Sequence, residues 1–194
     1  METFCVVKFK LYPKNPIGFE TENIGDLTIE EITNYAIVSL AIPDKNKKVL
    51  SKSIFSYYGL NLPDVGKSSI SEIDDTRILG IQPSQYFIIF QTNNINPKLH
   101  IEKVIKELGY LTDQSDSWSL IKLTGIKSKN ALARICPINL NDEAFKVNDV
   151  ARTSMEYIGV IIIKLTSNEF LLLSPRSSAH SFYHSIKTSA DNIL

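Results

Sequence analysis

The chain has 194 residues, 43% of them hydrophobic, which is enough to bury one large core or two smaller fused cores. Lysine plus arginine and aspartate plus glutamate both number 21, with no block of like charge, so neither a nucleic acid nor an anionic membrane is the expected partner. Cys5 and Cys136 fit no zinc, redox or disulfide spacing, and no apolar run reaches the roughly 20 residues of a membrane helix, so we expect a cytoplasmic protein.

An extended N-terminal arm is predicted for residues 1–30, because Pro13, Pro16, Gly18 and Gly25 interrupt any regular period. Apolar side chains in this arm would be costly to expose to water, at about 25 cal/mol per Å². The arm therefore packs on its own sheet or lies on a partner protein, and both alternatives stay open. We predict a partner interface that includes the apolar side chains Phe4, Val7, Phe9, Tyr12 and Phe19.

A first series of strands and helices follows the arm. Apolar runs predict strands at 37–42, 68–73, 77–81 and 86–91. Asp44 opens a helix that Gly59 ends, and Asn96 opens a second helix that Gly109 ends. A tight turn at 82–84 joins the last two strands as a hairpin.

A second series has the same order. Its strands are predicted at 118–123, 149–156, 159–165 and 169–174, and a tight turn at 166–168 joins the last two of them. Ser128 opens a short helix that Pro137 breaks, and apolar residues from Ala179 to Ile186 recur at helical spacing. The offset between the series runs from 78 residues (Leu62 to Leu140) to 83 residues (Phe87 to Phe170), so one small insertion reconciles them.

The repeated order predicts an α+β fold, in which duplicated β-α-β-β-β-α units are fused into one body, with mixed or antiparallel sheets and helices on one face. We expect one domain of two pseudo-repeats, residues 31–116 and 117–194, after the arm. Because each half-sheet alone would have an exposed edge, we also expect the strands at 37–42 and 118–123 to pair across a pseudo-twofold axis.

The residues of the second series resemble one known family. Ala131-Leu132-Ala133-Arg134-Ile135-Cys136-Pro137-Ile138-Asn139-Leu140, then Ala144-Phe145, Ala151-Arg152-Thr153 and Ser174-Pro175-Arg176-Ser177, resemble the gamma subunit of heterotetrameric sarcosine oxidase. The resemblance covers roughly residues 115–190. It departs where Asn139 replaces the family's aspartate and where Arg152 precedes Thr153 instead of following it. More distantly, the chain resembles the folate-binding region of the glycine-cleavage aminomethyltransferase, whose fold it is therefore expected to share.

This resemblance implies a non-catalytic gamma-type subunit of a heteromeric sarcosine oxidase complex, which converts sarcosine to glycine and transfers one carbon to tetrahydrofolate. The implied partners are larger flavin-dependent alpha and beta subunits and a small delta subunit. The implied cofactors are FAD, FMN, NAD and tetrahydrofolate, all on other subunits and none on this chain. Three alternatives stay open: the equivalent subunit of an N-methylglutamate dehydrogenase, a stand-alone folate-binding protein, and an amino-acid-sensing module.

A missing acid favours the non-catalytic interpretation. Aminomethyltransferases carry a catalytic aspartate beside a Gly-Ile-Ile stretch, just before the hairpin that contains Glu169-Phe170-Leu171-Leu172 here. Residues 157–168 of this chain contain no carboxylate. We therefore expect no catalytic, cofactor-binding or metal-binding residue in the chain.

Several further residues are candidate sites. Arg176 precedes the last helix and suits an interface salt link or an anion, and we assign Arg152 and Arg176 to the partner interface. His180 and His184 share a helical face, but no third ligand accompanies them, so surface positions are favoured. Core positions are predicted for Cys136 and Trp118. A solvated face is predicted for Lys45, Lys47 and Lys48, and a polar linker for Asp113 and Asp116.

Overall fold

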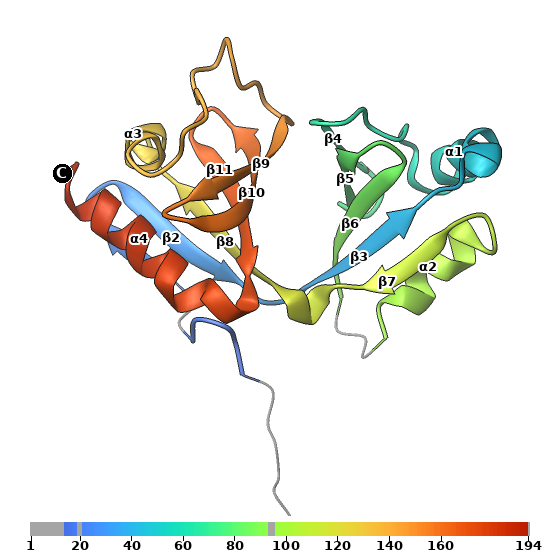
Figure 1. Cartoon of the computed structure of the whole chain (residues 1–194), viewed down its shortest axis with the longest axis horizontal. Coiled ribbons are helices and arrows are strands. Elements are labelled where there is room, and N and C mark those ends of the chain that lie inside the picture. The colour runs from blue at the N-terminus through green and yellow to red at the C-terminus, as the bar shows by residue number, and fades with distance from the viewer. Residues whose placement is uncertain (1–13, 19–20, 93–95, 194) are drawn as a thin grey trace, which may run out of the picture.

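The fold is described from a computed structural model for residues 14–18, 21–92 and 96–193 (Figure 1). The first half contains β3 (Tyr35–Ala41), η1 (Asp44–Asn46), α1 (Lys47–Tyr58), β4 (Ser68–Ile70), β5 (Arg77–Gln82), β6 (Gln85–Gln91), α2 (Lys98–Ile105) and β7 (Tyr110–Asp113). The second half contains η2 (Ser115–Ser117), β8 (Trp118–Thr124), α3 (Ser128–Ala133), β9 (Val150–Met155), β10 (Ile158–Thr166), β11 (Glu169–Pro175), η3 (Arg176–Ser178) and α4 (Ala179–Asp191). Two further strands, β1 (Thr21–Ile24) and β2 (Leu27–Ile32), precede both halves.

The described strands form two antiparallel sheets. One sheet has the order β4-β5-β6-β3-β7, and the other has the order β1-β2-β8-β11-β10-β9. The tight turns predicted at 82–84 and 166–168 join β5 to β6 and β10 to β11. The predicted helices are also present, and Gly59 ends α1 in the left-handed conformation at φ 68°. The predicted α+β fold class is confirmed.

The chain crosses between the sheets twice, and this arrangement corrects one prediction. The strand β2 pairs with β8 in one sheet and leads directly into β3 of the other, while β7 pairs with β3 and leads into β8. Figure 1 shows both crossings at the base of the molecule. The prediction that 37–42 pairs with 118–123 is therefore wrong, because β2 and β7 occupy the edges that those strands would have shared.

The structure also revises the predicted N-terminal arm. Residues 21–30 form β1 and most of β2, so they belong to the six-stranded sheet and not to an arm. Residues 14–18 pack on the same sheet: Ile17 is buried, and the amides of Ile17 and Gly18 donate to the buried carboxylate of Glu31 at 2.8 and 2.9 Å. The predicted interface residues Phe4, Val7, Phe9, Tyr12 and Phe19 lie outside the described residues.

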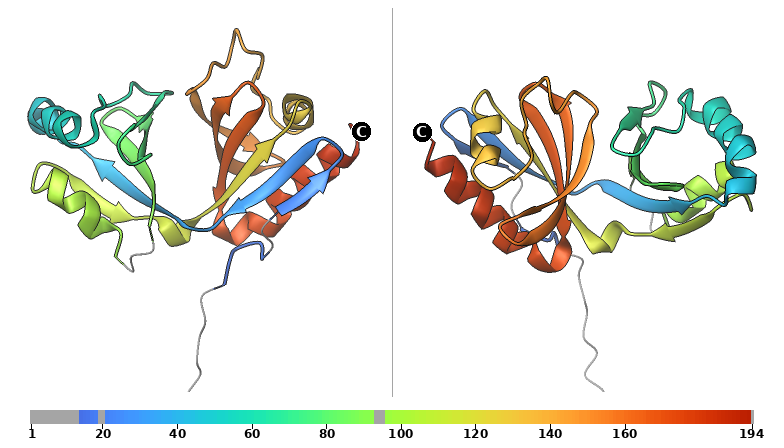
Figure 2. Two further views of the ribbon diagram at one scale, coloured as in Figure 1. Left: turned by 180° about the vertical axis from the view of Figure 1, so that it is seen from behind. Right: turned by 45° about the horizontal axis from the view of Figure 1, so that its top comes forward.

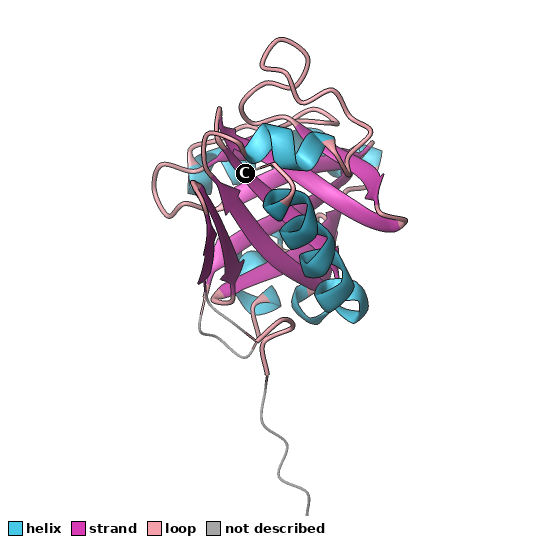
Figure 3. Ribbon diagram, turned by 90° about the vertical axis from the view of Figure 1, so that its left-hand side faces the viewer, coloured by secondary structure: helices cyan, strands magenta, loops and turns pink. Residues whose placement is uncertain are grey.

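Three apolar clusters hold the layers together. Helices α3 and α4 cover the outer face of the six-stranded sheet, and α1 and α2 cover the outer face of the five-stranded sheet (Figure 2). Figure 3 looks onto the first of these flanks, with the helices in front of the strands. The inner faces of the sheets pack on each other through a third cluster, the intersheet core, which includes Ile37, Leu79, Ile89, Leu120, Val150, Ile161, Ile163, Leu171 and Leu173.

A symmetric set of hydrogen bonds joins the two halves. The amide of Ser68 donates to the carbonyl oxygen of Asn148 at 2.7 Å, and the amide of Val150 donates to that of Gly66 at 2.8 Å. The strand registers make Ser68 equivalent to Val150 and Gly66 equivalent to Asn148, since each pairs identically with its neighbouring strand. Gly66 and Asn148 both have positive φ, at 82° and 68°. Two bonds exchanged between equivalent residues place a pseudo-twofold axis between the halves.

An ion pair lies on the same axis. Lys67 Nζ is 2.5 Å from Asp149 Oδ1, and the Lys146 amide donates to Asp149 Oδ2 at 2.8 Å. Burial by itself would raise the pKa of the Asp149 carboxyl, but the bonds from Lys67 and Lys146 outweigh it and hold that pKa below its usual value. Asp149 therefore stabilises the fold most when it is ionised.

We predict a pH-dependent effect of Asp149→Asn. A carboxyl whose pKa is lower in the folded state stabilises the fold above its unfolded pKa of about 3.9, and this contribution disappears as the pH falls through the folded pKa. The variant should be less stable than the native chain by about 1 kcal/mol at neutral pH, because the Lys67 side chain is half exposed. Urea unfolding at pH 7 and pH 3 measures the difference, and a difference that stays constant between these values contradicts the assignment.

Candidate functional site

Two cavities lie between the sheets, one on each side of the intersheet core. The first, called here the charged cavity, has a volume of about 310 Å³. It is lined by Ile32, Tyr35, Ile70, Asp75, Arg77, Ile89, Leu120, Lys122, Leu165, Glu169 and Leu171. The second cavity, of about 340 Å³, is lined by Ser39, Leu40, Ala41, Ile81, Gln85, Tyr86, Phe87, Gln114 and Arg152. Both cavities take residues from both halves of the chain.

The pseudo-twofold axis relates the two cavities. Ser39 pairs with Phe87 as Lys122 pairs with Leu171, and Ala41 pairs with Gln85 as Thr124 pairs with Glu169. Three lining residues of the second cavity are therefore equivalent to three of the charged cavity: Ser39 to Lys122, Gln85 to Glu169, and Phe87 to Leu171. Lys122 and Glu169 of the first cavity therefore have the neutral counterparts Ser39 and Gln85 in the second, whose one charged lining residue is Arg152. The shared fold does not require the charges at positions 122 and 169.

Arg77 is the most constrained charged group of the charged cavity. Its Nη1 donates to Ser68 Oγ at 2.9 Å and to Asn148 Oδ1 at 2.8 Å, so the side chain links the two halves. Burial lowers the pKa of the guanidinium. In the described part of the chain, both acceptors are neutral and no carboxylate forms an ion pair with Arg77.

The other charges of this cavity differ in whether they are paired. Lys122 Nζ is 2.8 Å from Glu30 Oε2, and the hydrogen bond that Lys122 donates to Glu30 raises the pKa of Lys122 despite partial burial. The side chains of Glu169 and Asp75 form no ion pair among the described residues. The cavity thus combines an apolar floor with Arg77, Glu169 and Asp75, which form no close ion pair among the described residues, although Glu169 attracts the Lys122 ammonium at longer range.

Sequence reasoning did not select these residues. Lys122 interrupts an apolar strand, and Arg77 and Glu169 stand at the first positions of β5 and β11. A charged residue inside an apolar run is a signal that could have been noticed. The meeting of three strands from two halves at one cavity depends on the sheet packing, which periodicity along the chain does not report.

The two arginines predicted at the partner interface lie on different elements, Arg152 on β9 and Arg176 in η3. Arg152 is exposed on β9 and lines the second cavity. Arg176 Nη2 donates to the carbonyl oxygen of Lys14 at 2.6 Å, and its Nη1 is 3.8 Å from the fully exposed carboxylate of Asp116. Arg176 therefore connects the N-terminal segment to η2.

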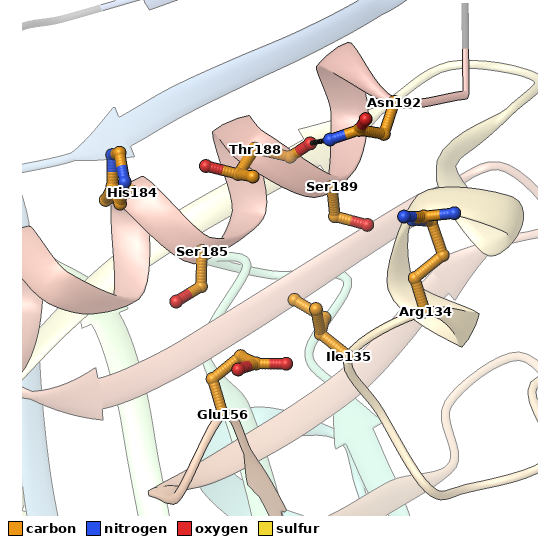
Figure 4. Close-up of a pocket in the computed structure, with 8 residues that line it drawn as sticks. All are labelled: Arg134, Ile135, Glu156, His184, Ser185, Thr188, Ser189 and Asn192. Atoms are coloured by element: carbon orange, nitrogen blue, oxygen red, sulfur yellow. Dashed lines mark hydrogen bonds between the residues drawn. The ribbon is translucent and has the colours of Figure 1, made fainter.

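His180 and His184 are both exposed on α4, as predicted. His184 lies at the rim of a further cavity of about 330 Å³ (Figure 4), which is formed by α4, the end of α3 and the turn between β9 and β10. Among the described residues, no three His, Cys, Asp or Glu side chains gather as metal ligands. Within this cavity Asn192 Nδ2 donates to the Thr188 carbonyl at 2.7 Å, a bond that ends the helix.

The remaining candidate residues lie in the core, at its edge or on the exposed surface. Cys136 is buried in the core under α3 and α4, and burial raises the pKa of its thiol, so the predicted core position is confirmed. Lys45, Lys47 and Lys48 are exposed, as predicted. Trp118 is half buried at the edge of the intersheet core, where its ring meets that of Phe87 edge-on at a centroid distance of 5.8 Å.

Known structures share this fold. A chain of heterotetrameric sarcosine oxidase from Corynebacterium sp. U-96, in complex with pyrrole 2-carboxylate, matches with a TM-score of 0.74 and 21% identity, over 89% of this chain and 88% of that one. Glycine cleavage system aminomethyltransferase T from Bartonella henselae matches with a TM-score of 0.61 and 13% identity, over 81% of this chain and 44% of that one. This chain therefore spans less than half of the aminomethyltransferase. The fold predicted from the resemblance is confirmed.

No family model and no curated protein matches the sequence. Within the described residues, no helix is both long enough and apolar enough to cross a membrane.

Proposed function

We propose that this chain is a non-catalytic, gamma-type subunit of a sarcosine-oxidase-type oxidoreductase complex. The observation that carries the proposal is the structural match with a chain of heterotetrameric sarcosine oxidase. That match covers nearly the whole of both chains, so it extends beyond one shared motif. The aminomethyltransferase match covers a smaller part of a longer enzyme, which favours the sarcosine oxidase chain as the better functional guide.

The positions of the family-like residues support a structural role. Cys136 and Phe145 are buried in the core that α3 and α4 cover. Arg176 contacts the N-terminal segment and η2. These contacts stabilise the chain itself and leave its outer surface to partner subunits. In the proposed complex, the larger alpha and beta subunits and a small delta subunit carry FAD, FMN, NAD and tetrahydrofolate, and the cytoplasm is the proposed location.

The proposed chemistry belongs to the complex as a whole, which oxidises sarcosine to glycine and transfers one carbon to tetrahydrofolate. Residues 157–168 contain all of β10 and parts of the turns on either side of it, and they include no carboxylate that could assist such a transfer. The chain would then brace the large subunits, and its obligate interfaces would together bury about 2,000 Å² or more.

Co-expression tests this proposal. The full chain is produced with and without the large flavin-dependent subunits of a sarcosine-oxidase-type complex from the same organism. We expect stoichiometric co-elution on size exclusion, and we expect the isolated chain to be colourless and inactive with sarcosine and tetrahydrofolate. A flavin absorbance band in the isolated chain, turnover by it, or separate elution of the subunits contradicts the proposal.

A deletion tests the N-terminal part of the proposed interface. Residues 14–18 pack on β2 and must be kept, so only residues 1–13 are removed. We expect co-elution with the large subunits to weaken while the circular dichroism spectrum and unfolding midpoint stay unchanged. The matched control is Val49→Ala on α1, an exposed apolar residue outside the predicted interface. Unchanged co-elution after the deletion would assign the interface to another surface.

A further inference from the structure

We propose that the charged cavity binds a small zwitterion, a molecule that carries one carboxylate and one ammonium group on a short apolar body. The volume of about 310 Å³ is at the lower end of the range for small-molecule sites. Arg77 binds the carboxylate and Glu169 binds the ammonium. The apolar floor of Ile89, Leu120 and Leu171 contacts the body of the ligand.

Arg77 lacks a carboxylate partner among the described residues, which supports its role as the carboxylate-binding group. A charge removed from water is usually paired, because desolvation costs free energy that only an opposite charge or strong hydrogen bonds recover. Arg77 is partly buried, and its hydrogen bonds to Ser68 and Asn148 both involve Nη1 and neutral oxygens. The guanidinium carries five N–H donors in a planar arrangement that matches a carboxylate. An incoming carboxylate supplies the charge that the described residues do not.

Glu169 places the opposite charge in the same cavity. Glu169 is half buried at the start of β11 and forms no ion pair among the described residues. Lys122, the other cation of the lining, forms its close ion pair with Glu30 and is attracted by Glu169 only at longer range. Arg77 and Glu169 line one cavity as a cation and an anion and form no ion pair with each other. A ligand with both charges complements both residues, and a simple anion complements only one.

Arg77 and Glu169 both have neutral equivalents at the pseudo-twofold-related positions of the fold. Glu169 has Gln85 as its equivalent, and Arg77 has Ile161, since Arg77 pairs with Ile89 as Ile161 pairs with Leu173. Both halves fold with these neutral residues in place. The charged pair is thus a property of one cavity and not of the fold. The inference does not rest on the proposed subunit role, because every residue used belongs to this chain alone.

Isothermal titration calorimetry on the full chain tests the site with three matched probes. L-valine carries both charges, 3-methylbutanoate lacks the ammonium, and 2-methylpropan-1-amine lacks the carboxylate. We expect saturable binding of L-valine at one site per chain, and binding at least tenfold weaker for each of the other probes. The Glu169→Gln variant introduces the residue of the second cavity and should weaken L-valine binding at least tenfold, without loss of any described hydrogen bond.

Two further variants complete the test. Arg77→Met should abolish L-valine binding, and its unfolding midpoint is measured in parallel because the substitution also removes the bond to Asn148. Arg152→Met changes the second cavity and should bind L-valine as the native chain does. The proposal is overturned if L-valine does not bind, if 3-methylbutanoate binds equally well, or if Glu169→Gln leaves the affinity unchanged. These outcomes are independent of co-elution with partner subunits, so the two proposals fail separately.

Discussion

Replacing Leu79 with alanine is expected to destabilise the whole chain by about 2–5 kcal/mol, because it opens a cavity in the intersheet core. Leu79 on β5 has no exposed surface and packs with residues of both sheets. A loss of this size is a large part of the roughly 5–15 kcal/mol that stabilises a typical domain. If the two halves form one cooperative unit, the loss should appear in every spectroscopic signal.

Trp118 makes this expectation measurable. It is the single tryptophan of the chain and contacts Phe87 of the other half, so its fluorescence reports on the separation of the sheets. Urea unfolding followed by fluorescence and by far-ultraviolet circular dichroism should give coincident midpoints, both lowered together in Leu79→Ala. Val49→Ala, on the exposed face of α1, should stay within about 0.5 kcal/mol of the native chain. Two separate transitions, with only one of them shifted, would show that the halves unfold independently.

Replacing Lys164 with methionine is expected to cost about 2–4 kcal/mol, since it leaves buried carbonyl groups without a donor. Lys164 on β10 is 1% exposed. Its Nζ donates to the carbonyl oxygens of Phe145 at 2.6 Å and Leu140 at 3.5 Å, and to Asp142 Oδ1 at 2.5 Å. The ammonium thus holds the loop between α3 and β9 on the sheet, and methionine fills the space without replacing the bonds.

The matched control for Lys164 is Lys129, which pairs with the other oxygen of the same carboxylate at 3.0 Å. This pair lies on the surface, so Lys129→Met should cost less than about 1 kcal/mol. Urea unfolding of the two variants gives the comparison. Equal stabilities of Lys164→Met and the native chain would show that water replaces the lysine as donor to the two carbonyl groups.

Lys164 also shows how the copies have diverged. Its equivalent in the first half is Gly80: the Gly80 amide donates to Lys67 as the Lys164 amide donates to Asp149. A methyl group at position 80 would overlap with the backbone of Asp64, because the loop of the first half closes directly on the strand there. The second half keeps its loop farther away and fills the space with the lysine side chain. The sequence repeat predicts equivalent strands. It does not predict that a loop backbone fills the space beside Gly80, while the Lys164 side chain fills the equivalent space in the second half.

The local structure could be predicted from the residues. Apolar periods, turn residues at 82–84 and 166–168, and the stop at Gly59 each act within a few positions of the chain. The predicted helices and strands therefore recur in the structure with shifts of a few residues at their ends. The burial of Cys136 and the exposure of the lysines at the start of α1 were also predicted correctly.

Strand partners could not be predicted in this way. The consecutive buried residues in β3 and β8 reflect burial of both faces, but such a run carries no information on which strand forms each edge. The structure places β7 and β2 there, and this choice also moved residues 21–30 from a predicted arm into the sheet. Pairing of this kind depends on contacts between residues far apart in the chain.

By itself the sequence determined the duplicated order of elements, and the resemblance of its second half predicted the fold that the two matched structures share. Only the tertiary structure decided that the chain crosses twice between two sheets and that their inner faces pack together. It also brought Arg77, Lys122 and Glu169 to one cavity. The physical reason is one of range: side-chain periodicity, turns and helix ends act along a few residues, while strand pairing, sheet packing and the burial of charge are settled by surfaces that meet only in the folded chain.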